Sequence, residues 1–160
     1  SISPWAPRGL EPRATARLIA AGACAEPGCV AITSRIAYAR TCSVTSNGKL
    51  YVLGDYNSSP RQNRLTMYDP VSGLWTPLAT IPTGRGMAAA AVVGTKIFYT
   101  AGNACSNNCW LDTHEAYDIS SNIWSTLPAL PGGVRGLLSA SVVNGKVYVM
   151  GGVNSYTVPT

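Results

Sequence analysis

The chain has 160 residues, which is enough for about one ordinary domain. Lys and Arg number 12 against 7 Asp and Glu, so the formal net charge is +5, and only 12% of the residues are charged. A hydrophobic content of 46% with 16 Gly and 11 Pro indicates a packed core with many turns. This composition argues against a coiled coil, a basic nucleic-acid-binding arm and a membrane-spanning helix.

Residues 1–35 form a segment of their own. The sequence Trp5-Ala6-Pro7 resembles Trp75-Thr76-Pro77 further along the chain, which predicts a β-strand at Trp5. More residues follow Trp5 before the next strand pair than follow Trp75. We therefore expect an insertion here that contains Cys24 and Cys29, with an extra pair of strands as the alternative.

A repeated pattern begins after this segment and is the strongest signal in the chain. Residues 47–55 read NGKLYVLGD, residues 94–103 read GTKIFYTAGN and residues 144–152 read NGKVYVMGG, with their lysines 47 and 50 positions apart. A common period indicates one structural unit that is used several times. Other landmarks recur at shifts of 49 or 50: Tyr68-Asp69 with Tyr117-Asp118, Trp75 with Trp124, and Arg85-Gly86 with Arg135-Gly136.

Each unit is predicted to contain four short β-strands. The first strand is rich in small residues, at 86–93 and 136–143, and a two-residue turn follows it. Asn47-Gly48 and Asn144-Gly145 are the preferred pair for such a type I′ hairpin turn. The second strand alternates and contains aromatic and β-branched residues. The third strand ends at Tyr68 or Tyr117, and the fourth holds Trp75 or Trp124.

The small-residue doublet after a KLYVL-like strand, the Tyr-Asp pair and the spaced Trp resemble the kelch repeat, a class of β-propeller. WD repeats have a shorter period and a Trp-Asp signature, whereas Trp75 is followed by Thr76. The resemblance implies an all-β fold of kelch-like blades, each with four antiparallel strands, and an incomplete propeller of about 2.5–3 blades. It divides the chain into the N-terminal segment 1–35, blades at 36–84 and 85–133, and a partial blade at 134–160.

This number of blades is too small to close a propeller, which usually needs about 4–8. Two explanations stay open. The sequence is a piece of a longer protein, or several copies assemble as a homo-oligomer or a fibre and supply the missing strands.

Cysteine spacing suggests an oxidising compartment. Cys24 with Cys29 and Cys105 with Cys109 are candidate disulfide pairs, which leaves Cys42 unpaired. Asn57-Ser58-Ser59 is a candidate glycosylation site. Together these features predict a secreted, extracellular protein.

Arg85 and Arg135 are the candidate binding residues. In kelch propellers that bind acidic peptides, arginines at the start of the inner strand line the central cavity, and the resemblance carries that role to these two positions. The alternative is that each arginine pairs with a neighbouring carboxylate or with backbone carbonyls. The variable loops 54–66 and 102–114 are a second candidate surface.

Candidate chemistry is sparse elsewhere. Asp112, His114 and Glu115 form the only concentrated polar group, and we interpret them as part of a solvated loop rather than a metal or acid–base site. His114 is the only histidine, so we expect no metal and no cofactor. The copper-radical oxidases among kelch-type propellers need two histidines and a cysteine-linked tyrosine, which this chain does not supply.

The function expected from these observations is a non-catalytic extracellular propeller that is structural or binds a protein or glycan partner through its loops. One alternative is a fragment of a secreted propeller enzyme of the copper-radical oxidase type, with its catalytic residues outside this segment. A third possibility is an intracellular kelch adaptor, which five free thiols would favour. We expect no nucleic-acid partner and no membrane span.

Overall fold

The structure is a computed structural model that describes residues 16–18, 32–34, 40–55, 62–105 and 108–154. It divides into two compact units, Ser1–Ala37 and Tyr38–Thr160. In the first unit, β1 (Ala16–Leu18) pairs antiparallel with β2 (Ile32–Ser34). The strand predicted at Trp5 lies outside the described residues.

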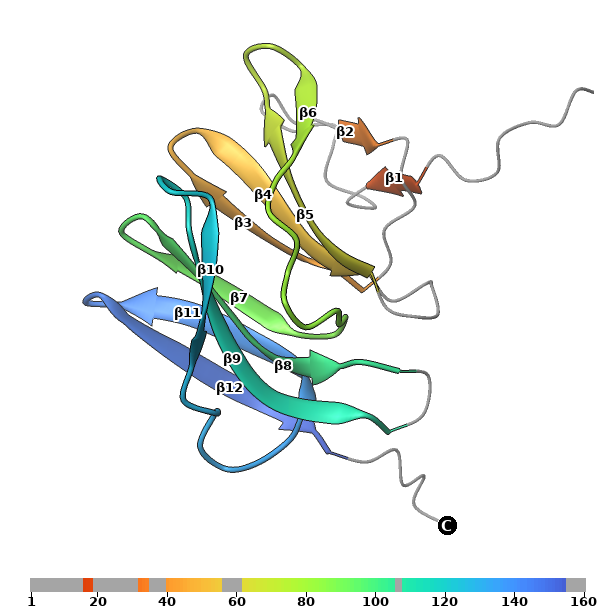
Figure 1. Cartoon of the computed structure of the whole chain (residues 1–160), viewed down its shortest axis with the longest axis vertical. Coiled ribbons are helices and arrows are strands. Elements are labelled where there is room, and N and C mark those ends of the chain that lie inside the picture. The colour runs from red at the N-terminus through yellow and green to blue at the C-terminus, as the bar shows by residue number, and fades with distance from the viewer. Residues whose placement is uncertain (1–15, 19–31, 35–39, 56–61, 106–107, 155–160) are drawn as a thin grey trace, which may run out of the picture. The chain divides into compact units, whose positions relative to one another are not determined.

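The described residues of the second unit form two four-stranded antiparallel sheets and one two-stranded sheet, in which each strand pairs with the next one along the chain (Figure 1). We call them blades 1, 2 and 3. Blade 1 consists of β3 (Cys42–Ser46), β4 (Lys49–Asp55), β5 (Gln62–Asp69) and β6 (Leu74–Pro77). Blade 2 consists of β7 (Ala89–Val93), β8 (Lys96–Asn103), β9 (Trp110–Asp118) and β10 (Ile123–Leu127). Blade 3 consists of β11 (Gly136–Val143) and β12 (Lys146–Val153).

The predicted all-β arrangement of four antiparallel strands per unit is confirmed by blades 1 and 2. The first strands of the three blades are neighbours, since β7 contacts both β3 and β11. No helix that is long and apolar enough to cross a membrane occurs in the described part of the chain.

Local sequence explains the hairpins. Asn47 and Gly48 have φ angles of 49° and 69°, and Asn144 and Gly145 have 50° and 71°, as the two central residues of a type I′ turn require. Some boundaries differ from the prediction: β7 begins at Ala89 rather than Gly86, and β5 and β9 end at Asp69 and Asp118, one residue later than predicted. Gly86 still forms an isolated bridge, with Asn103.

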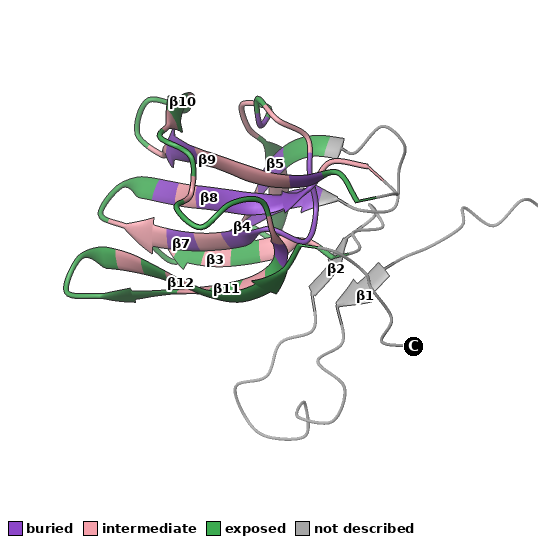
Figure 2. Ribbon diagram, turned by 90° about the horizontal axis from the view of Figure 1, so that it is seen from below, coloured by how far each residue is buried: buried purple, intermediate pink, exposed green. Residues whose placement is uncertain are grey.

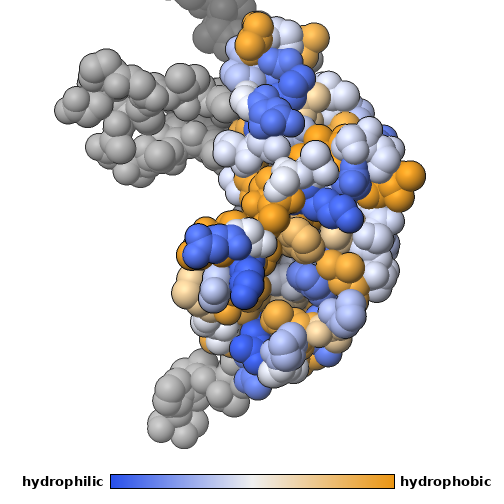
Figure 3. Space-filling model, turned by 90° about the vertical axis from the view of Figure 1, so that its left-hand side faces the viewer, coloured by the Kyte–Doolittle hydropathy of each residue, from blue (hydrophilic) through white to orange (hydrophobic). Residues whose placement is uncertain are grey.

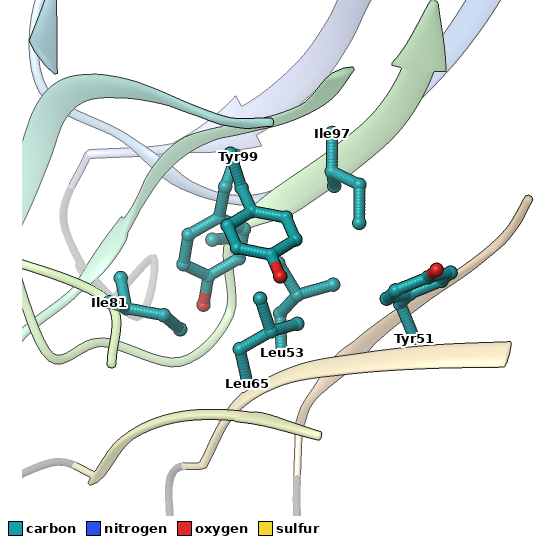
Figure 4. Packing of buried hydrophobic residues seen from close by; sticks show 8 residues of the cluster. Tyr51, Leu53, Leu65, Ile81, Ile97 and Tyr99 are labelled. Carbon is teal, nitrogen blue, oxygen red and sulfur yellow. The ribbon is translucent and has the colours of Figure 1, made fainter. Parts of the chain in front are cut away.

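The core lies between blades 1 and 2. Figure 4 shows Leu53 and Leu65 of blade 1 pointing toward Tyr99 of blade 2, with Ile81 and Ile97 beside them. Each of these side chains is at most 2% exposed. Burying one large apolar side chain stabilises a fold by about 1.5–3 kcal/mol, so this cluster is a main source of the cohesion between the two blades.

Blade 3 is much more exposed than the other blades (Figure 2). The repeat aligns Tyr148 and Met150 of β12 with Tyr51 and Leu53 of β4. Tyr51 and Leu53 are 4% and 0% exposed, whereas Tyr148 and Met150 are 49% and 52% exposed. The same strand pattern is therefore covered in blade 1 and uncovered in blade 3. The side of the molecule in Figure 3 shows hydrophobic residues interspersed with hydrophilic ones.

Gly54 allows blades 1 and 2 to approach closely. It follows the apolar part of β4 with a φ of 71°, and a Cβ atom there would overlap the carbonyl oxygen of Arg85 and the hydroxyl oxygen of Tyr99. Glycine is therefore required both for the backbone conformation and for the space.

The substitution Gly54→Ala is expected to lower the free energy of unfolding by about 2 kcal/mol more than Gly73→Ala does. Gly73 has the same φ of 71°, but no neighbouring atom lies within 4 Å of the position that an added methyl group would take, so it reports the backbone strain alone. Urea unfolding of both variants measures the difference. Equal losses would show that the close approach at Gly54 does not constrain the packing.

Candidate functional site

Arg85 lies before β7 and is completely buried, with an exposed fraction of 0%. Its Nη1 donates hydrogen bonds to Glu115 Oε2 at 2.5 Å and to the carbonyl oxygen of Thr83 at 2.9 Å. Its Nη2 donates to the carbonyl oxygen of Tyr99 at 2.9 Å. Of the two roles that the sequence left open, the structure places Arg85 in the pairing role, with no exposed guanidinium for a ligand.

Glu115 and Tyr99 complete this buried network. Glu115 is 1% exposed and also accepts a hydrogen bond from the Thr83 hydroxyl at 3.0 Å. The Tyr99 ring lies under the guanidinium, with Arg85 Cζ 4.2 Å from its centroid, and its hydroxyl donates to the carbonyl oxygen of Arg85 at 2.9 Å. Burial raises the pKa of Tyr99, so this hydroxyl keeps its proton and remains a donor. The extra hydrogen bonds offset part of the desolvation cost of the buried charges.

Arg135 occupies the corresponding position before β11, but its surroundings differ. It is only half-buried, its Nε donates to the carbonyl oxygen of Gly133 at 3.3 Å, and its Nη2 donates to the carbonyl oxygen of Gly132. The ion pairs within the described residues are Lys49–Asp69 and Arg85–Glu115, so no described carboxylate pairs with Arg135.

The backbone of Arg135 is fixed by blade 2. Its N–H donates to the carbonyl oxygen of Leu111 at 3.0 Å, and its own carbonyl oxygen accepts from the N–H of Gly102 at 2.8 Å. These hydrogen bonds fix the backbone of Arg135 at the start of β11, and its guanidinium is half-buried there. Such a group can bind a carboxylate of a partner.

A pocket of about 380 Å³ lies beside Arg135, lined by His114, by the connection 128–131 and by residues 147–149 of β12. The N–H of Leu130 donates to the carbonyl oxygen of Asp112 at 2.8 Å. One repeat earlier, the N–H of Ile81 donates to the carbonyl oxygen of Asn63, also at 2.8 Å. The pocket between blades 2 and 3 therefore corresponds to the core between blades 1 and 2.

This space is left unfilled because the residues around it are smaller or more polar than their counterparts in the core. Val149 stands where the core has Tyr99, and His114 stands where the core has Leu65. In the core, Trp124 also packs on Tyr99 with the ring centroids 6.4 Å apart. The described part of blade 3 has no strand that could supply such a Trp.

His114 projects from β9 and is half-buried. Its Nδ1 lies 2.7 Å from the hydroxyl oxygen of Thr100, and its ring stacks on Phe98 with the centroids 5.8 Å apart. Burial lowers the pKa of His114, the positive charge of Arg85 lowers it further, and Glu115 partly opposes both effects. The imidazole is therefore more readily neutral than a free one.

The interpretation of Asp112, His114 and Glu115 as a solvated loop is wrong. All three lie in β9, which begins at Trp110, because the strand pairs with β8 over its whole length apart from an irregularity between Thr100 and Gly102. Within the described ranges, no group of three or more His, Cys, Asp or Glu residues could hold a metal ion.

Glu115 is the functional residue that the sequence did not reveal as a partner of Arg85. The strand alternation did indicate that Glu115 is buried, because Glu115 lies two residues before the buried Tyr117 and therefore on the same face of the sheet. The aromatic landmarks pack within the sheets. The Tyr68 and Trp75 rings are 4.9 Å apart, and those of Tyr117 and Trp124 are 5.2 Å apart.

The structure joins Cys105 and Cys109 in a disulfide that closes a small loop before β9. Cys42 is a free thiol whose Sγ donates to the carbonyl oxygen of Ala88 at 2.5 Å. Burial raises the pKa of Cys42 to about 12, so the thiol stays protonated and unreactive. The other candidate pair, Cys24 and Cys29, and the candidate glycosylation site Asn57 lie outside the described residues.

Comparison with known proteins agrees with this geometry. Residues 37–82 match the family model described as the kelch motif. The chain is 33% identical over 118 residues to Kelch-like protein 23 of Mus musculus, covering 72% of this chain and 21% of the relative. It is 31% identical over 120 residues to the F-box/kelch-repeat protein SKIP30 of Arabidopsis thaliana, covering 68% of this chain and 34% of the relative.

The solved structure titled "Structure of YjhT" superimposes with a TM-score of 0.62 and 25% sequence identity, covering 75% of this chain and 36% of that one. Successive four-stranded antiparallel sheets built from one repeat make this chain part of a β-propeller. The repeats are kelch repeats, and the chain belongs to the kelch-repeat β-propeller family. It spans about a fifth to a third of the length of the curated relatives described above.

The prediction of a secreted protein is wrong. The relatives are Kelch-like proteins of mouse and Xenopus laevis and an F-box/kelch-repeat protein, and proteins of this type are typically intracellular. The prediction failed because short cysteine spacings show only that a local loop can close. They carry no independent information about the compartment.

The substitution Glu115→Gln is expected to lower the free energy of unfolding by about 3 kcal/mol or more, since it leaves the buried Arg85 guanidinium without a counter-charge. The half-exposed pair Lys49–Asp69, with Nζ and Oδ2 3.0 Å apart, provides the control. Lys49→Gln is expected to cost less than about 1 kcal/mol. Chemical unfolding compares the two variants, and equal costs would contradict the structural role of the buried pair.

Stability is expected to fall as the pH drops below about 6.5, the ordinary pKa of His, because protonation of His114 is less favourable in the folded chain than in the unfolded one. Above that pH His114 is neutral in both the folded and the unfolded chain, so its protonation takes nothing from the stability. Unfolding measured from about pH 7.5 to about pH 5 stays above the range in which Asp69 and Asp118 titrate.

The variant His114→Leu, which introduces the residue found at the matching position 65, is the control for this titration. Its stability is expected to change less with pH across the same range. An unchanged pH dependence in His114→Leu would assign the effect to another group.

Proposed function

We propose that this chain is part of a non-catalytic kelch module that binds protein partners, and that Arg135 with its adjoining pocket receives an acidic side chain of the partner. The observation that carries the proposal is the contrast between two arginines at the same point of the repeat. Arg85 is buried against Glu115, whereas Arg135 is half-buried with no described carboxylate partner.

The fixed backbone at Arg135 supports a binding role. Backbone hydrogen bonds with Leu111 and Gly102 already hold the main chain at Arg135. Binding of a ligand to the guanidinium therefore has no cost for ordering this part of the backbone. The neighbouring pocket offers apolar walls from Leu130, Val147 and Val149, which favour a side chain or backbone segment of a protein over a small ion.

Binding of a fluorescein-labelled glycine-serine peptide that carries several glutamates tests the proposal, with its glutamine counterpart as the uncharged probe. Fluorescence anisotropy is expected to show that Arg135→Gln weakens binding of the glutamate peptide about tenfold, because a hydrogen bond to a charged group is lost. The matched control Arg64→Gln removes another exposed arginine and is expected to leave the affinity unchanged. Equal binding of the two peptides, or equal effects of the two substitutions, would contradict the proposal.

A further inference from the structure

We propose that the disulfide between Cys105 and Cys109 is a reversible thiol–disulfide exchange site that glutathione or a dithiol reduces in the folded chain, and that its reduction lets the adjoining end of β8 and β9 open. This inference does not depend on binding at Arg135. The two cysteines are joined in the structure, whereas the relatives are of a type that is typically intracellular. In a reducing compartment a disulfide is usually transient, catalytic or redox-sensing.

The position of Cys109 gives an incoming thiol access to the bond. Cys109 is exposed, and Cys105 is half-buried. An exposed disulfide is more readily reduced than a buried structural one. The remaining described cysteine, Cys42, is a free thiol whose pKa burial raises to about 12. Exchange among the described residues therefore takes place at Cys105 and Cys109.

The exchange consists of two balanced steps. The thiolate of the reductant attacks the sulfur of the exposed Cys109, a mixed disulfide forms, and Cys105 leaves as a thiolate that takes up a proton. The second thiol of a dithiol, or a second glutathione, then loses its proton and attacks the mixed disulfide, and Cys109 leaves as a thiolate and is protonated. The protein disulfide is thereby reduced to two thiols, while two thiols of the reductant are oxidised to one disulfide.

The backbone around the two cysteines allows the bond to form again. β8 and β9 run side by side up to the pair Asn103 and Trp110 (Figure 1). Beyond this pair, the N–H of Ala104 donates to the carbonyl oxygen of Cys109 at 3.0 Å, and the N–H of Cys105 donates to Asn103 Oδ1 at 2.9 Å. None of these contacts involves sulfur, so they bring the two thiols back together after reduction.

The same end of β8 and β9 holds the segments that precede two first strands. Asn103 is 1% exposed and exchanges two backbone hydrogen bonds with Gly86, at 2.8 and 3.1 Å. Gly102 and Leu111 form backbone hydrogen bonds of 2.8 and 3.0 Å with Arg135. A covalent link between nearby residues restricts the open conformations of the chain between them. Reduction of the disulfide therefore loosens the attachment of both segments.

Trp110 extends this coupling to the start of β11. It follows Cys109 directly and is 5% exposed, and its ring occupies the space that a Cβ atom at Gly136 would need. Its backbone is paired with Asn103 at the end of the ladder. When this end opens, the contact between the Trp110 ring and Gly136 is lost as well.

Glutathione titration of the folded 160-residue chain tests the exchange. The variant Cys24→Ser/Cys29→Ser removes the other candidate pair and keeps Cys105 and Cys109. A large excess of reduced glutathione is expected to add the two thiols of one disulfide to those that maleimide labelling and intact mass detect. Oxidised glutathione is expected to remove them again. A disulfide that resists glutathione until urea unfolds the chain would overturn the proposal.

Amide hydrogen exchange of the unaltered chain tests the opening of the β8–β9 end. Reduction is expected to speed exchange of the Gly86 and Arg135 amides about tenfold, because the covalent link no longer restricts opening. The amide of Leu78 donates to the carbonyl oxygen of Leu65 at 2.9 Å in blade 1, and it is expected to keep its rate. Unchanged rates at Gly86 and Arg135 after complete reduction would contradict the coupling.

The variant Cys105→Ser/Cys109→Ser is the matched control. Its Gly86 amide is expected to exchange at the fast rate in both reduced and oxidised glutathione. A response to glutathione that persists in this variant would assign the effect to another cysteine and reject the site. Equally faster exchange at Leu78 and Gly86 in the reduced unaltered chain would indicate a general loss of stability and reject local opening.

Discussion

The buried ion pair between Arg85 and Glu115 is the interaction on which the packing of blades 1 and 2 depends. It joins the connection between the blades to β9, and the Arg85 backbone carbonyl meets the Tyr99 hydroxyl at the point where Gly54 leaves space for both. Neither charge reaches solvent, so each one requires the other, and this requirement fixes where β7, β8 and β9 lie relative to the end of β4.

The space between blades 1 and 2 and the space between blades 2 and 3 have the same backbone hydrogen bonds but are lined by different side chains. The hydrogen bonds that attach the connecting segments to the third strands are repeated, from Ile81 to Asn63 and from Leu130 to Asp112. The side chains are not repeated: Leu65 and Tyr99 fill the first interior, while His114 and Val149 leave a pocket in the second. A repeat protein can keep its fold through backbone contacts while the packed residues diverge, because neighbouring units contact one another locally.

Arg85 and Arg135 occupy the same position of the repeat, but their side chains have different surroundings in the described residues. Both precede the first strand of a blade, and within residues 40–55, 62–105 and 108–154 only Arg85 has a third strand of its own blade beside it that supplies a carboxylate. The family resemblance gave both arginines a binding role, because sequence similarity marks the position in the repeat. It does not report which neighbouring side chains reach that position.

The sequence by itself determined the period, the four-stranded units, the type I′ turns and the kelch family, because turn residues and alternation act over a few neighbouring positions. It also contained the alternation that buries Glu115 with Tyr117, although its partner could not be recognised. Only the tertiary structure decided that Arg85 is buried, that Asp112 and His114 lie in a strand rather than a loop, and that a pocket adjoins Arg135. These features depend on contacts between residues about 15–50 positions apart in different strands and connections, and no local pattern encodes the space left between two packed sheets.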